Sequence, residues 1–230
     1  MNAAATTIVV MAKECIPGKV KTRLHPPLSF EDAARVASAS LTDTLDAVAA
    51  TGLPVTVCAQ GNIAVPAGFV SIPQVSGGLD ERIAAAVDTC GGRVLLIGMD
   101  TPQVDPRLLR ALADDWSDHV DAWFGPATDG GFWLLGLGNL SSDRLGGRTR
   151  GDLVRGVPMS SPETGLRQRE RLIEAGLSVQ DVGPLTDIDD IDSLREVAAV
   201  LPQTGTLAQL LPRLDLPPAL AAEPREGSRS

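Results

Sequence analysis

The chain is poor in the residue types on which several classes of protein depend. Its 230 residues include no Tyr, two His and three Cys. Cys15, Cys58 and Cys90 are widely spaced and odd in number, so they predict neither a disulfide framework nor a CxxC metal site. Two isolated histidines give little support for a zinc site or for a Ser-His-Asp triad. The chemistry of this chain is therefore expected to depend on other residues.

Long hydrophobic runs and an excess of positive charge are also missing. No apolar stretch approaches the roughly 20 residues needed to span a bilayer, and the first residues lack the pattern of a secretory signal. We therefore expect a cytoplasmic protein with no membrane partner. The net charge is −9, with 20 Lys and Arg against 29 Asp and Glu. Because nucleic-acid binding needs a basic face, no nucleic-acid partner is expected. The sequence does not predict an oligomeric state.

Two common catalytic motifs are absent as well. The chain has neither the GxGxxG fingerprint of dinucleotide-binding folds nor the GxSxG turn of the α/β-hydrolases. The pair Gly18-Lys19 is followed by Val20 instead of Ser or Thr, which excludes a Walker phosphate-binding loop.

What the chain does contain is an alternation of strand-like and helix-like segments. Strands are predicted at 6–12, 54–60, 68–74, 93–100, 121–127, 132–138 and 177–183, and helices at 29–51, 77–92, 105–116 and 161–175. The segment 187–201 is predicted to hold an acidic turn and a closing helix. This order predicts an α/β fold with a mainly parallel sheet. We expect a single domain over residues 1–216 and a disordered tail over residues 217–230, which is rich in Pro, Ala and charge.

A basic loop follows the first predicted strand. The segment "MAKECIPGKVKTRLHPPL" contains Lys13, Lys19, Lys21 and Arg23. If the chain is extended there, Lys19, Lys21 and Arg23 point the same way, and with backbone N–H groups near Gly18 they could hold a polyphosphate. The alternative is an ordinary solvated surface loop.

Acidic residues follow two later strands. Asp100 ends the strand in "LLIGMDTP", and Asp187 and Asp189 are two apart in "TDIDDID". Two carboxylates about 5 Å apart repel by roughly 3 kcal/mol at a dielectric constant of about 20, and Mg²⁺ or Mn²⁺ would reverse that sign. Alternatively, Asp100 caps the next turn and the later acids favour a helix N-terminus, a role that suits Asp190 and Asp192 best.

The segment "PATDGGFW" places Asp129 before two glycines. A ligand could approach the backbone closely there, although Asp-Gly is also typical of a plain hairpin turn.

Five collinear segments resemble the DUF2064 family of candidate glycosyltransferases or nucleotidyltransferases. They are "MAKECIPGKVKTRL", "GGLDERIAAAV", "LLIGMDTP", "GPATDGGFWLLGL" and "LTDIDDIDSL", and the resemblance covers roughly residues 6 to 200. It implies the three-layer GT-A (nucleotide-diphospho-sugar transferase) fold, in which helices cover both faces of a mixed, mostly parallel sheet. The first and last motifs are also similar to those of phospholactate and phosphoenolpyruvate guanylyltransferases.

The resemblance also implies roles for individual residues. Lys21, Arg23 and Asp100 would act in catalysis, and Asp100, Asp187 and Asp189 would hold one or two Mg²⁺ (or Mn²⁺) ions. The implied nucleotide-binding residues are Ala12, Lys13, Gly18, Lys21, Arg23, Gly78 and Arg82, and the implied acceptor-binding residues are Asp129, Gly130 and Gly131.

Four positions depart from the family pattern. Asp80 replaces a Gly, Ser193 replaces an acidic residue, and Met159-Ser160-Ser161 replaces Trp-Ser-Thr. Phe132 stands where relatives have Tyr, so it offers no hydroxyl group to an acceptor.

These observations predict a Mg²⁺-dependent nucleotidyltransferase. It would move a nucleoside monophosphate from an NTP to a small acceptor that carries a phosphate or carboxylate, and release pyrophosphate. One alternative is a glycosyltransferase that uses a nucleotide-diphospho-sugar. The other is a nucleotide-binding protein of the same fold that has lost catalysis.

Overall fold

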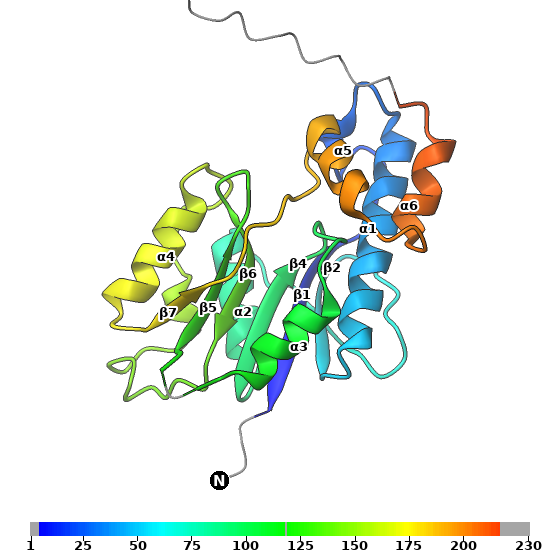
Figure 1. The fold of residues 1–230 in the computed structure, drawn as a ribbon. Coiled ribbons are helices and arrows are strands. Elements are labelled where there is room, and N and C mark those ends of the chain that lie inside the picture. Colours follow the sequence, from blue (N-terminus) through cyan, green and yellow to red (C-terminus); the bar gives the residue numbers. More distant parts are fainter. Residues whose placement is uncertain (1–4, 118, 217–230) are drawn as a thin grey trace, which may run out of the picture.

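The described residues build one seven-stranded sheet at the centre of the molecule (Figure 1). The computed structural model describes residues 5–117 and 119–216, so the predicted tail at 217–230 lies outside the described residues. The strand order is β3-β2-β1-β4-β6-β5-β7. The strands are β1 (Thr6–Lys13), β2 (Val55–Gln60), β3 (Val70–Pro73), β4 (Arg93–Gly98), β5 (Ala122–Pro126), β6 (Phe132–Leu137) and β7 (Val179–Asp181).

The sheet is mixed but mostly parallel, as predicted. Strand β1 pairs in parallel with β2 and β4, β2 with β3, and β5 with β7. Strand β6 runs antiparallel to both of its neighbours, β4 and β5. The carboxyl ends of β1, β2 and β4 therefore meet the amino end of β6 at one edge of the sheet.

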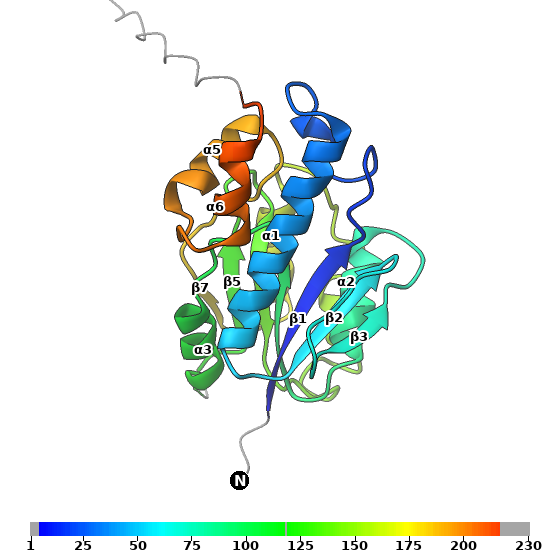
Figure 2. The ribbon, with the colours of Figure 1, turned by 90° about the vertical axis from the view of Figure 1, so that its right-hand side faces the viewer.

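Helices cover both faces of the sheet. Helices α1 (Phe30–Ala50) and α3 (Pro106–Asp114) pack on one face, and α2 (Leu79–Asp88) and α4 (Thr164–Glu174) on the other. The described residues also form α5 (Ile191–Val200) and α6 (Thr206–Leu210), with short 3₁₀ turns at η1 (Thr22–Leu24), η2 (Gly151–Leu153) and η3 (Leu211–Arg213). Figure 2 shows α1 and α3 on the near side of the sheet. None of the described helices is long and apolar enough to cross a membrane.

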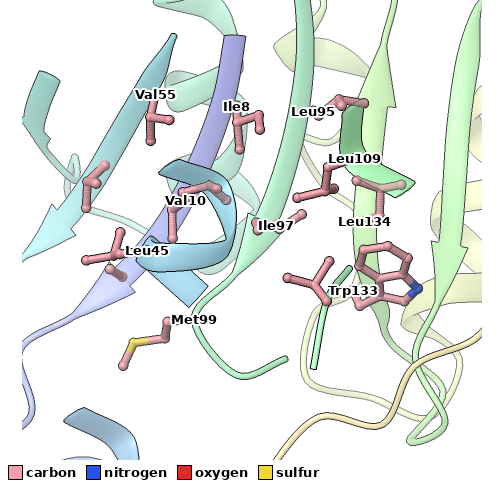
Figure 3. Close-up of a cluster of buried hydrophobic side chains, with 14 of the residues drawn as sticks. Ile8, Val10, Leu45, Val55, Leu95, Ile97, Met99, Leu109, Trp133 and Leu134 are labelled. Carbon is pink, nitrogen blue, oxygen red and sulfur yellow. The ribbon is translucent and has the colours of Figure 1, made fainter. Parts of the chain in front are cut away.

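The central strand β1 is apolar along its length because both of its faces are buried. Ile8 and Val10 point into a cluster with residues of α1 and α3, part of which is drawn in Figure 3. Val9 and Met11 point the other way, into a cluster with residues of α2 and α4. Side chains alternate between the two faces of a strand, so a continuous apolar run is what a three-layer fold requires.

The predicted helix starts at Ser29 and Asp105 are confirmed. The Ser29 hydroxyl accepts a hydrogen bond from the Asp32 N–H at 3.0 Å. The Asp105 carboxylate accepts one from the Arg107 N–H at 2.8 Å, and Pro106 occupies the first turn of α3. Each side chain satisfies a backbone donor that the helix itself leaves unpaired.

Three local predictions need correction. The basic loop is not extended, because Lys21 has φ 47° and the 3₁₀ turn η1 follows it. Helix α4 begins at Thr164 instead of 161, since the Thr164 hydroxyl accepts from the Ser161 N–H and donates to the Pro158 carbonyl, which holds the preceding residues in a turn. The short helix α6 was not predicted at all.

A third hydrophobic cluster lies beyond the sheet, where α5 and α6 pack beside one end of α1 (Figures 1 and 2). It includes Leu24 from η1, Val36 from α1 and Leu207 from α6, together with Ile188 from the acidic segment, residues 186–192. The Asp43 carboxylate on α1 accepts hydrogen bonds from the first N–H groups of α6, at 2.6 and 2.9 Å. This cluster therefore contacts the ends of both the basic loop and the acidic segment.

Candidate functional site

A cavity of about 670 Å³ opens at the sheet edge where the carboxyl ends of β1, β2 and β4 meet the amino end of β6. It collects residues from the basic loop, α2, the segment after β4, the turn before β6 and the acidic segment. The predicted site residues that line it are Ala12, Lys13, Lys21, Arg23, Arg82, Asp100, Asp129, Gly131, Asp187 and Asp189. Residues that are up to 177 positions apart in the sequence thus share one cavity. Ligands of open α/β sheets bind at this kind of edge.

Lys21 is the centre of the charged part of the cavity. Its side chain is 7% exposed, and its Nζ lies 2.9 Å from Asp100 Oδ1 and donates a hydrogen bond to Asp189 Oδ1 at 3.1 Å. Burial opposes the charged form of Lys21, but Asp100 and Asp189 outweigh it and raise the pKa of Lys21 above its ordinary value. The ammonium group therefore stays protonated between the two carboxylates.

A backbone hydrogen bond joins the acidic segment to Asp100, which follows β4. The Ile188 N–H donates a hydrogen bond to the carbonyl of Asp100 at 3.1 Å, and the Ile188 side chain is fully buried. Because neighbours in an extended segment point to opposite sides, the buried Ile188 directs both Asp187 and Asp189 toward the cavity. This is the arrangement that the Asp-Ile-Asp spacing predicts.

Asp187 differs from Asp100 and Asp189 in its electrostatics, which burial dominates. Its Oδ1 is enclosed and has no hydrogen-bond partner among the described residues. Burial, and then the negative charges of Asp100 and Asp129, raise the pKa of Asp187 to about 7. A buried carboxylate oxygen without a partner is costly in a folded protein and often marks a position that a ligand or cation completes.

Arg82 on α2 forms another wall together with two glutamines. Its guanidinium donates to Gln60 Oε1 at 3.1 Å and to Gln74 Oε1 at 3.4 Å. The Gln74 amide donates in turn to the carbonyls of Ala12 and Cys58, at 3.0 and 2.9 Å. Gln74 therefore continues the pairing of β1 and β2 beyond the ends of the strands and fixes the orientation of Arg82.

Sequence reasoning missed Gln60 and Gln74 as cavity residues. The only signal was their position, because each ends a predicted strand segment in the way that Asp100 does. Because glutamine is uncharged, neither residue stands out in the sequence as a candidate ligand-binding residue.

The turn before β6 and the segment before α4 form the opposite wall. Gly130 has φ +92°, and an added Cβ would lie 2.1 Å from the Pro162 carbonyl oxygen. The Gly165 N–H donates to the Gly130 carbonyl at 2.8 Å, and the Asp129 carboxylate accepts from the Gly131 N–H at 2.8 Å. This wall is completed by residues that sequence reasoning did not assign to the site, namely Met159, Ser160, Ser161, Pro162 and Thr164.

Some predicted residues lie elsewhere. Gly18, Gly78 and Gly130 do not line the cavity. Gly78 is the N-cap of α2, and Gly18 has φ +75° in an open turn of the basic loop. Lys13 and Arg23 line the cavity, where the Lys13 ammonium donates to the Lys19 carbonyl at 2.6 Å and Arg23 stays exposed. The ligand contacts assigned to these residues remain predictions.

The carboxylates that line the cavity suit a hard divalent cation. Asp100, Asp187 and Asp189 offer the carboxylate oxygens that Mg²⁺ and Mn²⁺ prefer, and the unpaired Asp187 Oδ1 fits such a ligand. Within residues 5–117 and 119–216, however, no group of three or more His, Cys, Asp or Glu side chains is disposed to hold a metal ion. The ammonium of Lys21 contacts two of these acids, Asp100 and Asp189.

Comparison with known proteins identifies a family and a fold. A family model described as "Uncharacterized protein conserved in bacteria (DUF2064)" matches residues 34–161, more than half of the chain. No curated protein sequence matches the chain.

Solved structures resemble most of the chain. A candidate nucleotide-diphospho-sugar transferase from Desulfovibrio desulfuricans G20 is 24% identical with a TM-score of 0.78, over 90% of this chain and 94% of that chain. A nucleotidyl transferase from Methanothermobacter is 15% identical with a TM-score of 0.50, over 84% and 95% of the two chains. A cytidylyltransferase from Leptospira borgpetersenii is 10% identical with a TM-score of 0.50, over 91% and 93%. These similarities confirm the predicted fold.

Proposed function

The chain belongs to the DUF2064 family, and we propose that it is a Mg²⁺- or Mn²⁺-dependent nucleotidyltransferase acting on a small acceptor that carries a phosphate or carboxylate. One observation carries the proposal: the buried Lys21 ammonium joins the basic loop to Asp100 and Asp189 inside a single cavity. Cationic side chains that face carboxylates across a cavity suit a ligand that is itself an anion with a bound cation. A nucleoside triphosphate with its divalent metal has this charge pattern.

The residues of the cavity have separable tasks in this proposal. Lys13, Lys21 and Arg23 bind phosphate oxygens, lysine as a compact charge and arginine through a two-pronged fork. Asp100, Asp187 and Asp189 would hold the metal, which when bound neutralises charge that develops on the phosphates. The Asp129-Gly130-Gly131 turn would position the acceptor.

The reaction itself needs little from the protein beyond positioning and charge. An acceptor oxygen attacks the α-phosphorus, the bond from that phosphorus to the bridging oxygen of the β-phosphate breaks, and pyrophosphate leaves with the electron pair. An acceptor phosphate or carboxylate is already anionic, so no general base is required. Holding the two reactants in line inside the cavity supplies the main rate gain.

Product analysis tests the proposal. The protein is incubated with each NTP, Mg²⁺ and a panel of small phosphorylated and carboxylated acceptors, and pyrophosphate is measured. Pyrophosphate release that requires both an NTP and an acceptor supports nucleotidyl transfer. Absence of nucleotide binding in a thermal-shift panel of NTPs and nucleotide-sugars, with and without Mg²⁺, would refute it.

Glycosyl transfer is the second candidate, because the Desulfovibrio neighbour is named for nucleotide-diphospho-sugars. The same cavity and acids would serve that reaction, but a nucleoside diphosphate would leave instead of pyrophosphate. The basic loop favours the triphosphate, since a longer anionic chain can use more cationic donors. Release of a nucleoside diphosphate from a nucleotide-sugar would establish this second function in place of the first.

A further inference from the structure

We propose that Lys21 holds the place of the divalent cation in the nucleotide-free protein, and that a polyphosphate must draw it away before the metal binds. The inference rests on the proposed function and adds an order to it. Its basis is the position of the Lys21 ammonium, which is 2.9 Å from one predicted metal ligand and 3.1 Å from another.

The ammonium and a metal ion would compete for the same carboxylate oxygens. Lys21 Nζ contacts Oδ1 of Asp100 and Oδ1 of Asp189, so a cation that binds both acids would stand beside a second positive charge. Repulsion between charges this close is strong in a partly buried site. With Lys21 in place, the described part of the chain offers no ready group of three metal ligands. Asp187 Oδ1 has no hydrogen-bond partner within residues 5–117 and 119–216.

A phosphate bound in the cavity would offer the Lys21 ammonium alternative partners. Its side chain lines the same cavity as Lys13 and Arg23, which the proposed function assigns to the phosphates. The ammonium group has three N–H donors, and a phosphate group offers several acceptor oxygens in return for the two carboxylates. The loop need not move as a whole, because Leu24 and Leu28 anchor its far end in the third hydrophobic cluster.

The backbone at Lys21 supports a functional role for this contact. Lys21 and Ser160 are the two residues other than glycine with positive φ in the described ranges, at 47° and 57°. Both line the cavity. Such conformations are unfavourable for side-chain-bearing residues and gather at binding sites, where the surrounding structure enforces them.

A thermodynamic consequence follows from this exchange. If a polyphosphate removes Lys21 from the acids, the nucleotide increases the affinity of the protein for metal, and the metal increases the affinity for nucleotide by the same factor. In the absence of nucleotide, Lys21 should keep the affinity for metal low. Removing the Lys21 charge should therefore raise the affinity of this site for metal in the absence of nucleotide.

Titration of Mn²⁺ without nucleotide tests the inference, with the free Mn²⁺ signal read by electron paramagnetic resonance. The variants are Lys21→Met and the matched control Lys19→Met, which removes the same charge from an exposed residue of the same loop that lines the cavity. We expect Lys21→Met to bind one Mn²⁺ at least tenfold more tightly than the unmodified protein, and Lys19→Met to change affinity less than twofold. The double variant Lys21→Met/Asp100→Asn should lose the gain.

Three results would overturn the inference. They are an unchanged or lower Mn²⁺ affinity in Lys21→Met, an equal gain in Lys19→Met, and a gain that survives Asp100→Asn. If Lys21→Met does not fold, Lys21→Gln carries the same expectation. Nucleotide binding is measured separately by thermal shift. A protein that binds no nucleotide while Lys21→Met still gains Mn²⁺ would refute the proposed function alone, whereas normal nucleotide binding with no gain would refute the exchange alone.

Discussion

Substituting Gly130 by Ala should loosen the wall of the cavity that we assign to the acceptor. Gly130 has φ +92°, and its added Cβ would lie 2.1 Å from the carbonyl oxygen of Pro162. A side chain at positive φ costs roughly 1–2 kcal/mol. Displacing Pro162 also weakens the hydrogen bond from the Gly165 N–H to the Gly130 carbonyl, which contributes about 1 kcal/mol. We therefore expect a loss of about 2–3 kcal/mol in the free energy of unfolding.

Gly68→Ala is the matched control. Gly68 has nearly the same backbone conformation, with φ +90°, but an added Cβ would meet no atom within 4 Å. It should cost only the conformational part, about 1–2 kcal/mol. The two variants then differ by the weakened hydrogen bond, about 1 kcal/mol. For a chain of this size that corresponds to about 2–4 °C, so Gly130→Ala should melt about 2–4 °C below Gly68→Ala.

The assay is thermal unfolding of both variants, followed by steady-state kinetics once an acceptor is known. The KM for the acceptor should rise in Gly130→Ala while the KM for the nucleotide changes little. Equal melting temperatures for the two variants would refute the argument that the two segments lock together. A nucleotide KM that rises as much as the acceptor KM would refute the assignment of this wall to the acceptor.

Four further substitutions test the other walls of the cavity. Asp100→Asn and Asp187→Asn should each remove the Mg²⁺-dependent part of the thermal shift caused by an NTP, and an unchanged shift in both would show that the metal ligands are elsewhere. Gln74→Leu leaves the carbonyls of Ala12 and Cys58 without their donor, so it should lower the free energy of unfolding by about 1–3 kcal/mol in denaturant unfolding. It should also weaken nucleotide binding in a titration, and stability equal to that of the original protein would contradict this role. Arg23→Met removes an exposed charge, so we expect an unchanged melting temperature with weaker NTP binding, and the reasoning fails if stability drops instead.

The layers of the fold were predictable because they depend on patterns that are local in sequence. The apolar run of β1, the cap residues Ser29 and Asp105, and the alternation of strands and helices each follow from a few neighbouring residues. The convergence of the basic loop with Asp100, Asp187 and Asp189 was also predictable, since parallel strands present their carboxyl ends at one edge.

The parts that escaped prediction depend on contacts between distant segments. The basic loop turns at Lys21 because its ammonium is drawn inward by two acids that lie far along the chain. Gln74 acts through carbonyls of β1 and β2, and α6 is fixed by Asp43 from α1. In each case the partner could not be identified before the fold was known.

The third hydrophobic cluster gives remote positions an influence on the charged site. Leu24 and Ile188 are buried in the same cluster as Leu207. Leu24 is three residues from Lys21, and Ile188 lies between Asp187 and Asp189 in the sequence. Hydrophobic packing in this cluster therefore helps to hold Lys21 close to Asp189. Substitutions in α5 and α6 are therefore expected to alter ligand binding in the cavity without changing any residue that lines it.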